Sequence, residues 1–383
     1  MSAQTLYAPA PVHEADLPPL VTTDELTAAA TPAPAAPAPG AGTDTGRVHR
    51  YHLSPAEAEQ ARRLAARCLA EYGRVDSPRF LTEVRVLAAD LPRGLRMAVN
   101  TARLDDRKHG LVISGNPVDG QELGATPAGW QFADTQASRA HAFLIMLYGA
   151  LLGDVVSWAT QQDGRIVTDV VPAPGMEDSL VSSSSRTELG WHTEDAFSPC
   201  RADYVGLFCL RSPELTATTI GHLDLRALPA AVEQVLRQPR FQIMPDTSHD
   251  AALNTDHDRS GRTDAFERLE RVRRKPPQIP LIEGHRQAPV LRIDGDFVSA
   301  AEGDQEAAAA LAWLKDHLSA SLYDFPLAPG DVGFIDNRNV VHGRRPFRPR
   351  YDGTDRWLKR INIVADLRRT RPGRSSTTTR VIG

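Results

Sequence analysis

Residues 190–211 read GWHTEDAFSPCRADYVGLFCLR, and this stretch decides the fold more than any other part of the chain. Its second half, Asp203 to Arg211, is apolar and β-favouring, which predicts a strand. Directly before that strand stands the triplet His192-Thr193-Glu194. Residues two apart on an extended segment point to the same side, so this imidazole and this carboxylate can meet one cation. The stretch therefore predicts a β-rich fold with a candidate metal site.

The triplet is not specific by itself. With 12 histidines and 48 acidic residues in 383 positions, roughly 1.5 such triplets are expected by chance. A second triplet does occur, at His222-Leu223-Asp224, and a surface histidine beside a solvated acid explains either one. A third candidate ligand, His342, lies in DNRNVVHGRRPFRPRYDGTDRWLKRIN, residues 336–362. Two histidines and one carboxylate can form a facial triad, which leaves three positions of an iron ion open.

Apolar periodicity outside these two stretches predicts a few helices and many short strands. Helices are expected at about 54–71, 78–103, 134–152, 228–236 and 302–318. Strands are expected at about 111–114, 155–161, 165–171, 204–211, 217–223, 241–244, 290–293, 332–335 and 360–365. Asp163-Gly164 is a turn signal that predicts a hairpin between the second and third of these strands. Many short strands with long connections favour a sandwich or jelly roll over a doubly wound sheet.

Composition divides the chain into one domain with two arms. Residues 1–45 are rich in Pro and Ala and are expected to be a disordered arm. Residues 46–367 are expected to form a single domain, and the polar, charged segment 245–277 to be a lid or an insertion within it. Residues 368–383 are expected to be a flexible basic tail.

Charge and cysteine content exclude several classes of protein. The net charge of −4 argues against a nucleic-acid partner, and no apolar run approaches the ~20 residues of a membrane span. The start of the chain does not have the pattern of a secretory signal. Cys68, Cys200 and Cys209 are too few and too scattered for a disulfide framework or a CxxC zinc site. A cytoplasmic protein with a small-molecule partner is expected; the sequence predicts no oligomeric state.

Residues 190–211 and 336–362 together resemble the clavaminate synthase-like branch of the iron(II)/2-oxoglutarate oxygenases, and the resemblance extends over about residues 75–366. It implies a mainly β or α+β fold, a cupin-like double-stranded β-helix (jelly roll) with flanking helices. It also implies that His192, Glu194 and His342 bind Fe(II), with 2-oxoglutarate and O2 as cosubstrates and no separate catalytic side chain. His222 then becomes an ordinary residue at the end of a strand.

The resemblance also implies a cosubstrate site. Arg356, fourteen positions after His342, is expected to clamp the far carboxylate of 2-oxoglutarate, because a planar guanidinium grips a carboxylate with two hydrogen bonds. A surface ion pair is the alternative for this arginine. Thr219, in Ala217-Thr218-Thr219, is expected to touch the same cosubstrate.

Within that branch, the chain looks most similar to the free-arginine oxygenases, and Asp294 and Asp296 in LRIDGDF carry this likeness. If the segment is extended, both carboxylates face one pocket and suit a guanidinium; if Asp-Gly forms a turn, both face water. The resemblance favours the pocket. It also implies further substrate contacts by Gln161 (with Gln162 as a rival), Leu180, Ser182, Asp246, Arg360 and the second oxygen of Glu194.

The expected reaction is hydroxylation of free L-arginine at an unactivated carbon, C3 in the first place and C4 as a further step, in specialised-metabolite (antibiotic) biosynthesis. Another basic or cyclised guanidino amino acid, or desaturation, is the nearest alternative. A zinc hydrolase with the same ligands and a non-catalytic jelly-roll binding protein are the alternatives from other classes.

Overall fold

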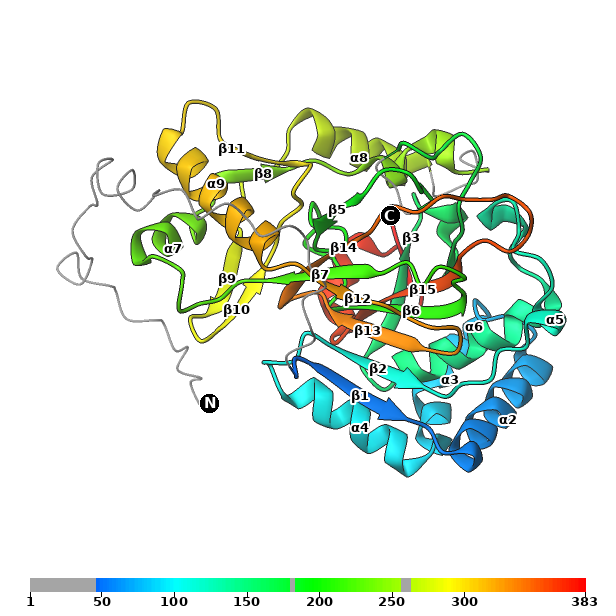
Figure 1. The fold of residues 1–383 in the computed structure, drawn as a ribbon. Helices are drawn as coiled ribbons and strands as arrows, with labels where there is room; N and C mark the ends of the chain where they lie inside the picture. Colours follow the sequence, from blue (N-terminus) through cyan, green and yellow to red (C-terminus); the bar gives the residue numbers. More distant parts are fainter. Residues whose placement is uncertain (1–45, 180–182, 256–262) are drawn as a thin grey trace, which may run out of the picture.

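In the computed structural model the described residues are 46–179, 183–255 and 263–383, and two β-sheets lie at their centre (Figure 1). The larger sheet has the order β1-β2-β13-β6-β15-β3-β16, with β4 also paired to β15. Its strands are β1 (Val48–His52), β2 (Gly110–Ser114), β3 (Asp154–Trp158), β4 (Thr168–Val170), β6 (Tyr204–Arg211), β13 (Val332–Asp336), β15 (Trp357–Val364) and β16 (Val381–Ile382). The smaller sheet, in the order β12-β7-β14-β5, consists of β5 (Leu189–His192), β7 (Thr218–His222), β12 (Tyr323–Phe325) and β14 (Val340–Arg344).

The remaining elements cover these sheets. Two short antiparallel pairs are formed by β8 (Phe241–Ile243) with β11 (Val298–Ala300) and by β9 (Ile282–His285) with β10 (Ala288–Leu291). The helices are α2 (Pro55–Tyr72), α3 (Pro78–Leu87), α4 (Arg93–Leu104), α5 (Gly120–Leu123), α6 (Gln136–Gly149), α7 (Ala230–Leu236), α8 (Thr263–Arg274) and α9 (Gln305–Ala320). Single 3-10 turns are η2 (Ala88–Asp90), η3 (Trp130–Phe132), η4 (Gln162–Gly164), η5 (Thr247–His249), η6 (Ala251–Leu253) and the longer η7 (Leu367–Gly373).

Strand β6 is buried on both faces, and its alternate side chains belong to two different hydrophobic cores. Val205, Leu207 and Cys209 point toward the smaller sheet and join the core between the two sheets. The intervening Phe208 and Leu210 point the other way, into the core shared with helices α2, α3 and α6. An unbroken apolar strand of this kind is required where both faces of a sheet are covered. Figure 1 shows these helices along one face of the larger sheet, with α7 and α9 at the far end of the molecule.

The helical layer departs from expectation at one proline. The long helix predicted over 78–103 is divided into α3 and α4, with η2 between them. Pro92 is the cause, because it lacks an amide hydrogen and disfavours a helical conformation at the residue before it. By contrast, α2 begins as predicted: the side chains of Ser54 and Glu57 form a capping box.

The predicted hairpin around Asp163-Gly164 is wrong. Strands β3 and β4 do not pair with each other; both pair with β15. The turn lies in η4, which has positive φ at Gln162 and Asp163. The side chain of Gln162 holds this turn by bonding the backbone of Asp169 at both the amide and the carbonyl, at 3.0 and 2.8 Å.

Three segments were expected to be disordered or to lack strands: residues 1–45, 245–277 and 368–383. The predicted arm, residues 1–45, lies outside the described residues. Within 245–277 the described residues form η5, η6 and α8 and, as predicted, no strand of a sheet. The C-terminal residues 368–383, predicted as a flexible tail, instead contain part of η7 and strand β16. None of the helices described is long and apolar enough to cross a membrane.

The C-terminal strand is held by several contacts that the sequence did not suggest. β16 runs parallel to β3, where Val381 lies opposite Ser157 and Ile382 opposite Trp158. Ile382 is 1% exposed and belongs to the core that contains Trp158. Arg380 also forms an ion pair with Asp154 at 2.8 Å. The tail therefore supports the strand that leads into the loop carrying Gln161.

We expect Ile382→Ala to lower the free energy of unfolding by about 2–4 kcal/mol, because it removes a buried side chain and leaves a cavity. Urea denaturation followed by fluorescence measures the change. Thr377→Ala, an exposed position in the same segment, serves as the control and should change the free energy of unfolding by less than about 0.5 kcal/mol. Equal stability of the two variants would show that the strand does not support the core.

Candidate metal and substrate site

The smaller sheet brings the three predicted metal ligands together. In the antiparallel pairing of β14 with β5, His342 lies directly opposite His192. Nε2 of His342 is 3.3 Å and Nε2 of His192 is 3.6 Å from Oε2 of Glu194, and all three side chains are largely buried. Two ligand atoms that each lie ~2.1 Å from one ion, at a right angle to each other, are about 3 Å apart. The distances of 3.3 and 3.6 Å are close to this value, so the three side chains can bind a single cation.

Hydrogen bonds orient two of the three ligands. Nδ1 of His192 donates to the carbonyl of Gly190 at 2.9 Å, which leaves Nε2 free to bind a metal. Oε1 of Glu194 accepts from Nη1 of Arg360 at 2.7 Å, so only Oε2 faces the two histidines. Burial raises the pKa of Glu194, but Arg360 and the two histidines outweigh burial and hold this pKa well below its usual range. Burial lowers the pKa of His342, so the site presents a carboxylate at Glu194 and a neutral imidazole at His342.

Two residues fix the backbone of the His192–Glu194 triplet. The amide and hydroxyl of Thr193 both donate to the carbonyl of Ile293, at 2.8 and 3.1 Å. The fully buried Asn337 accepts from the amide of Glu194 at 2.7 Å and donates to the carbonyls of Glu194 and Ala202. Thr193 thus joins the triplet to the segment before Asp294, and Asn337 joins it to the segment before His342. Neither residue was predicted to have a role, although both lie inside the stretches that suggested the site.

A cavity on one side of the ligands contains Arg356. It is lined by Val170, Leu189, His192, Glu194, Val205, Leu207, Thr218, His342, Gly343, Arg344, Arg356, Leu358 and Arg360. Arg356 is 6% exposed, its Nε has no hydrogen-bond partner, and no described residue forms an ion pair with its guanidinium. Burial lowers the pKa of Arg356 to about 10. A buried cation without a counter-ion indicates a site for an anionic ligand.

Strand β7 contains two adjacent threonines, Thr218 and Thr219, and only one of them lines the cavity of Arg356. Thr219 was predicted to touch the cosubstrate, but Thr218 lines the cavity of Arg356 and Thr219 does not. Adjacent residues in a strand point to opposite faces. Thr218 is paired with Arg344, which also lines the cavity, whereas Thr219 is paired with Gly343. The threonine that lines this cavity is therefore Thr218, one residue before the predicted Thr219.

A second cavity, which shares His192, Glu194 and Arg360 with the first, collects most of the predicted substrate residues. It is lined by Gln161, Leu189, Gly190, His192, Glu194, Asp195, Asp246, Ser248, Asp294, Asp296, Phe297 and Arg360. Nη2 of Arg360 donates to Oε1 of Gln161 at 3.1 Å, which supports Gln161 over its rival Gln162. Leu180 and Ser182 lie outside the described residues.

Asp294 and Asp296 combine the two geometries that the sequence left open. β10 ends at Leu291, and Asp294 forms an isolated antiparallel bridge with His192. A turn follows, in which Oδ1 of Asp294 accepts from the amides of Asp296 and Phe297. Both residues nevertheless line the cavity. The amide of Gly295 donates to the carbonyl of Trp191 at 3.2 Å, which holds the turn against β5. Burial raises the pKa of Asp294 to about 6.

One glycine makes this approach of the turn to β5 feasible. A Cβ at Gly190 would lie 2.3 Å from Oδ2 of Asp296, so a larger residue there would push the carboxylate away. Gly190 thus leaves room beside β5 for the carboxylate of Asp296.

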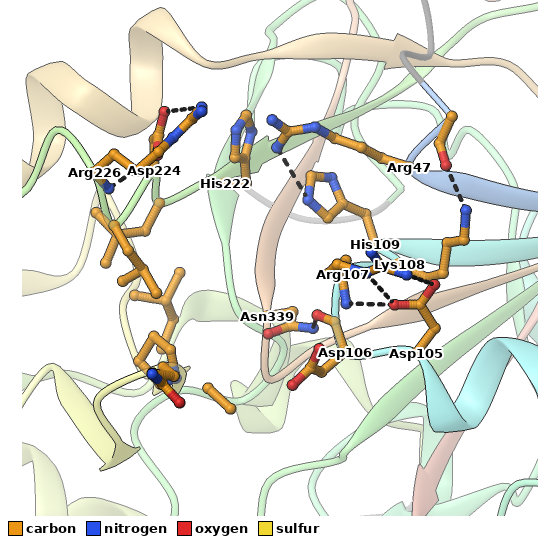
Figure 2. A pocket seen from close by; sticks show the side chains of 17 residues that line it. Arg47, Asp105, Asp106, Arg107, Lys108, His109, His222, Asp224, Arg226 and Asn339 are labelled. Atoms are coloured by element: carbon orange, nitrogen blue, oxygen red, sulfur yellow. Dashed lines mark hydrogen bonds and ion pairs between the residues drawn. The ribbon is translucent and has the colours of Figure 1, made fainter.

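The rival triplet His222-Leu223-Asp224 lies elsewhere, beside a separate cavity of about 600 Å³ (Figure 2). There Asp224 is paired with Arg226 at 2.9 Å, and the ring of His222 lies 4.8 Å from that of His109. Among the residues described, no third metal-ligating side chain groups with His222 and Asp224. This triplet therefore has the ordinary surface and strand-end explanation.

The comparisons with known proteins agree with this geometry. A sequence model of the family described as "Taurine catabolism dioxygenase TauD, TfdA family" matches residues 140–362. Enduracididine beta-hydroxylase of Streptomyces hygroscopicus is 39% identical over 337 residues, covering 86% of this chain and 98% of that protein. L-ornithine/L-arginine 3-hydroxylase of Catenulispora acidiphila is 38% identical over 347 residues, covering 88% of this chain and all of that protein. A crystal structure of the non-heme iron oxygenase OrfP with Fe, succinate and (3S)-hydroxy-L-Arg matches with a TM-score of 0.83 at 39% identity, covering 87% of this chain and 99% of that one.

We expect Asn337→Ala to weaken binding of a divalent metal by about tenfold or more, because the amide and carbonyl of Glu194 lose their fixed partner. Anaerobic calorimetric titration of the purified protein with Fe(II) or Mn(II) measures this affinity. Asn339→Ala is the matched control, since the Asn339 side chain bonds the carbonyl of Asp106 away from the site. Unchanged affinity in Asn337→Ala would show that the ligand triplet does not depend on this residue.

Proposed function

This chain belongs to the TauD/TfdA family of dioxygenases, and we propose on that basis that it hydroxylates free L-arginine at C3, with C4 as a further position. Its enzyme class, an iron- and 2-oxoglutarate-dependent amino-acid hydroxylase, is that of its relatives. The observation that carries the proposal is a pair of carboxylates, Asp294 and Asp296, in the same cavity as His192 and Glu194. A guanidinium is the cation that suits two neighbouring carboxylates best, because its planar fork donates several hydrogen bonds at once.

The metal role is assigned to His192, Glu194 and His342. Iron(II) bound there, together with 2-oxoglutarate and O2, supplies the oxidation that places one oxygen atom in a C–H bond while 2-oxoglutarate becomes succinate and carbon dioxide. The donor set of two imidazoles and one carboxylate suits iron(II) and leaves positions for both cosubstrates. The protein's own contribution is positioning, and no further acid or base is assigned to the reaction.

The two cavities divide the remaining tasks. Arg356 binds the far carboxylate of 2-oxoglutarate, and Thr218 assists in the place first expected for Thr219. In the second cavity Gln161, Asp246 and Arg360 orient the amino-acid head of the substrate. Arg360 performs two functions in this proposal: it holds Oε1 of Glu194 and it offers positive charge to the substrate carboxylate.

We also propose a finer description of the fold and its domains. The core shared between the larger and the smaller sheet supports their interpretation as the two walls of a double-stranded β-helix, with residues 46–367 as one catalytic domain. The segment 245–277 is proposed as a lid because Asp246 and Ser248 line the substrate cavity.

A second candidate substrate is a cyclised guanidino amino acid. The likeness to enduracididine beta-hydroxylase is as strong as that to the arginine hydroxylase and favours this candidate specifically. It keeps the guanidino group that Asp294 and Asp296 would bind, so the two candidates differ in the shape of the substrate and not in its charge.

Direct oxidation of candidate amino acids tests the proposal. Protein incubated anaerobically with Fe(II), 2-oxoglutarate and a panel of arginine, enduracididine, ornithine and lysine, and then exposed to air, is expected to add sixteen or thirty-two mass units to arginine. Mass spectrometry and succinate formation measure the result. A loss of two mass units would indicate desaturation instead. Product formed without O2 or 2-oxoglutarate would support a hydrolase, and the absence of any product would contradict the proposed function.

The role of the paired aspartates has its own test. We expect the double variant Asp294→Asn/Asp296→Asn to raise the Michaelis constant for arginine by about a hundredfold or more, because two charge-assisted hydrogen bonds are weakened. Asn keeps the volume and lets Oδ1 of residue 294 still cap the turn. The Michaelis constant for 2-oxoglutarate should change little, and Asp316→Asn, an exposed acid on α9, should leave both constants unchanged. Undiminished affinity for arginine would assign the aspartates to the turn alone.

A further inference from the structure

Asp195, the residue that follows Glu194, lines the same cavity, but its carboxylate belongs to a buried hydrogen-bond network. Asp195 has a φ of +53°, and its side chain is 1% exposed. Oδ1 of Asp195 accepts from Nε2 of His249 at 3.0 Å, and Oδ2 accepts from Nε1 of Trp158 and from Nδ2 of Asn362. Burying a carboxylate is unfavourable unless such donors surround it. The left-handed backbone at Asp195 directs Glu194 and Asp195 to different partners.

His249 lies in a segment distant in sequence, residues 246–254, which we call the anchor segment. Its ring is 0% exposed and packs edge-on against Trp158 and Phe197, with centroids 5.5 and 5.0 Å away. Nδ1 of His249 accepts from the hydroxyl of Thr160 at 2.7 Å. Both ring nitrogens are therefore bonded, and His249 is the most deeply buried residue of the anchor segment.

The remaining contacts of the anchor segment lie on either side of His249. Ser248 accepts from Nε2 of Gln161 at 2.6 Å, and Asp246 lines the substrate cavity next to it. At the far end Asn254 donates to the carbonyl of Thr160 and accepts from the amide of Asp163, both at 2.9 Å. The positions of Asp246 and Gln161 thus depend on how the segment is seated, and His249 forms its deepest contact.

We propose that Asp195 and His249 are a positioning pair: their buried contact fixes the anchor segment relative to Glu194 and thereby places Asp246 and Gln161 in the substrate cavity. The inference rests on the proposed substrate site but adds a residue that does not touch the substrate, since His249 does not line the cavity. An effect of His249 on substrate binding must therefore act through its neighbours.

Amide hydrogen exchange on the full chain, without metal or substrate, tests the seating of the anchor segment directly. We expect His249→Phe to accelerate exchange in peptides covering residues 246–254 by about ten- to a hundredfold, because a buried charge-assisted hydrogen bond is lost. Thr247→Ala, an exposed change in the same turn, is the matched control and should leave exchange unchanged. If His249→Phe does not fold, Asp195→Asn, which keeps the volume, takes its place. Unaltered exchange in the folded variant would overturn the proposal.

Steady-state kinetics separate positioning from a general loss of structure. We expect His249→Phe to raise the Michaelis constant for the amino acid by about tenfold or more and that for 2-oxoglutarate by less than about twofold. More succinate should form per product, because a poorly held substrate is oxidised less often. His249→Gln, which can still donate to Asp195, should restore part of the affinity. An equal loss for both substrates, or no rescue, would contradict the positioning role. The hydrogen-exchange test uses no substrate, so its result remains valid even if arginine is not the substrate.

Discussion

The site depends on one cross-strand pair, in which His342 on β14 lies opposite His192 on β5. These residues are 150 positions apart in sequence, and only the pairing of the two strands brings their Nε2 atoms to the same carboxylate oxygen. A shift of one residue in that pairing would turn every side chain of the strand to the opposite face, so the metal ligands would separate. Thr193 and Asn337 prevent such a shift, because each bonds the backbone of the ligand triplet to a different neighbouring segment.

Two buried arginines near the metal ligands, Arg356 and Arg360, differ in their partners. Arg360 forms an ion pair with Glu194 and a hydrogen bond with Gln161, so it orients a ligand of the metal while it also lines the second cavity. Arg356 is equally buried but has no such partner. The two guanidinium groups therefore differ: that of Arg360 organises the metal site through its protein partners, whereas the charge of Arg356 is left entirely for a ligand.

The sequence predicted that His192, Glu194 and His342 lie together, most of the strands and helices, and several of the residues that line the second cavity, because each is encoded locally or by family motifs. It did not predict features that depend on tertiary contacts. The side chain of Gln162 stabilises a turn after β3 where a hairpin was expected. Strand β16 forms because its backbone pairs with the edge of β3. Thr218 and Thr219 differ by one position, which no periodicity could resolve without the pairing of β7 with β14. Asp195 and His249 carried no sequence signal, since their pairing joins distant segments.

The unpaired guanidinium of Arg356 also links the stability of the folded chain to its chemistry. A buried cation without a counter-ion destabilises the native state, and any dianion that neutralises it shifts the equilibrium toward that state by mass action. The abundance of 2-oxoglutarate would then influence how long each molecule survives unfolding and degradation, apart from how fast it turns over. The protein would thus persist best under metabolic conditions in which it is able to work.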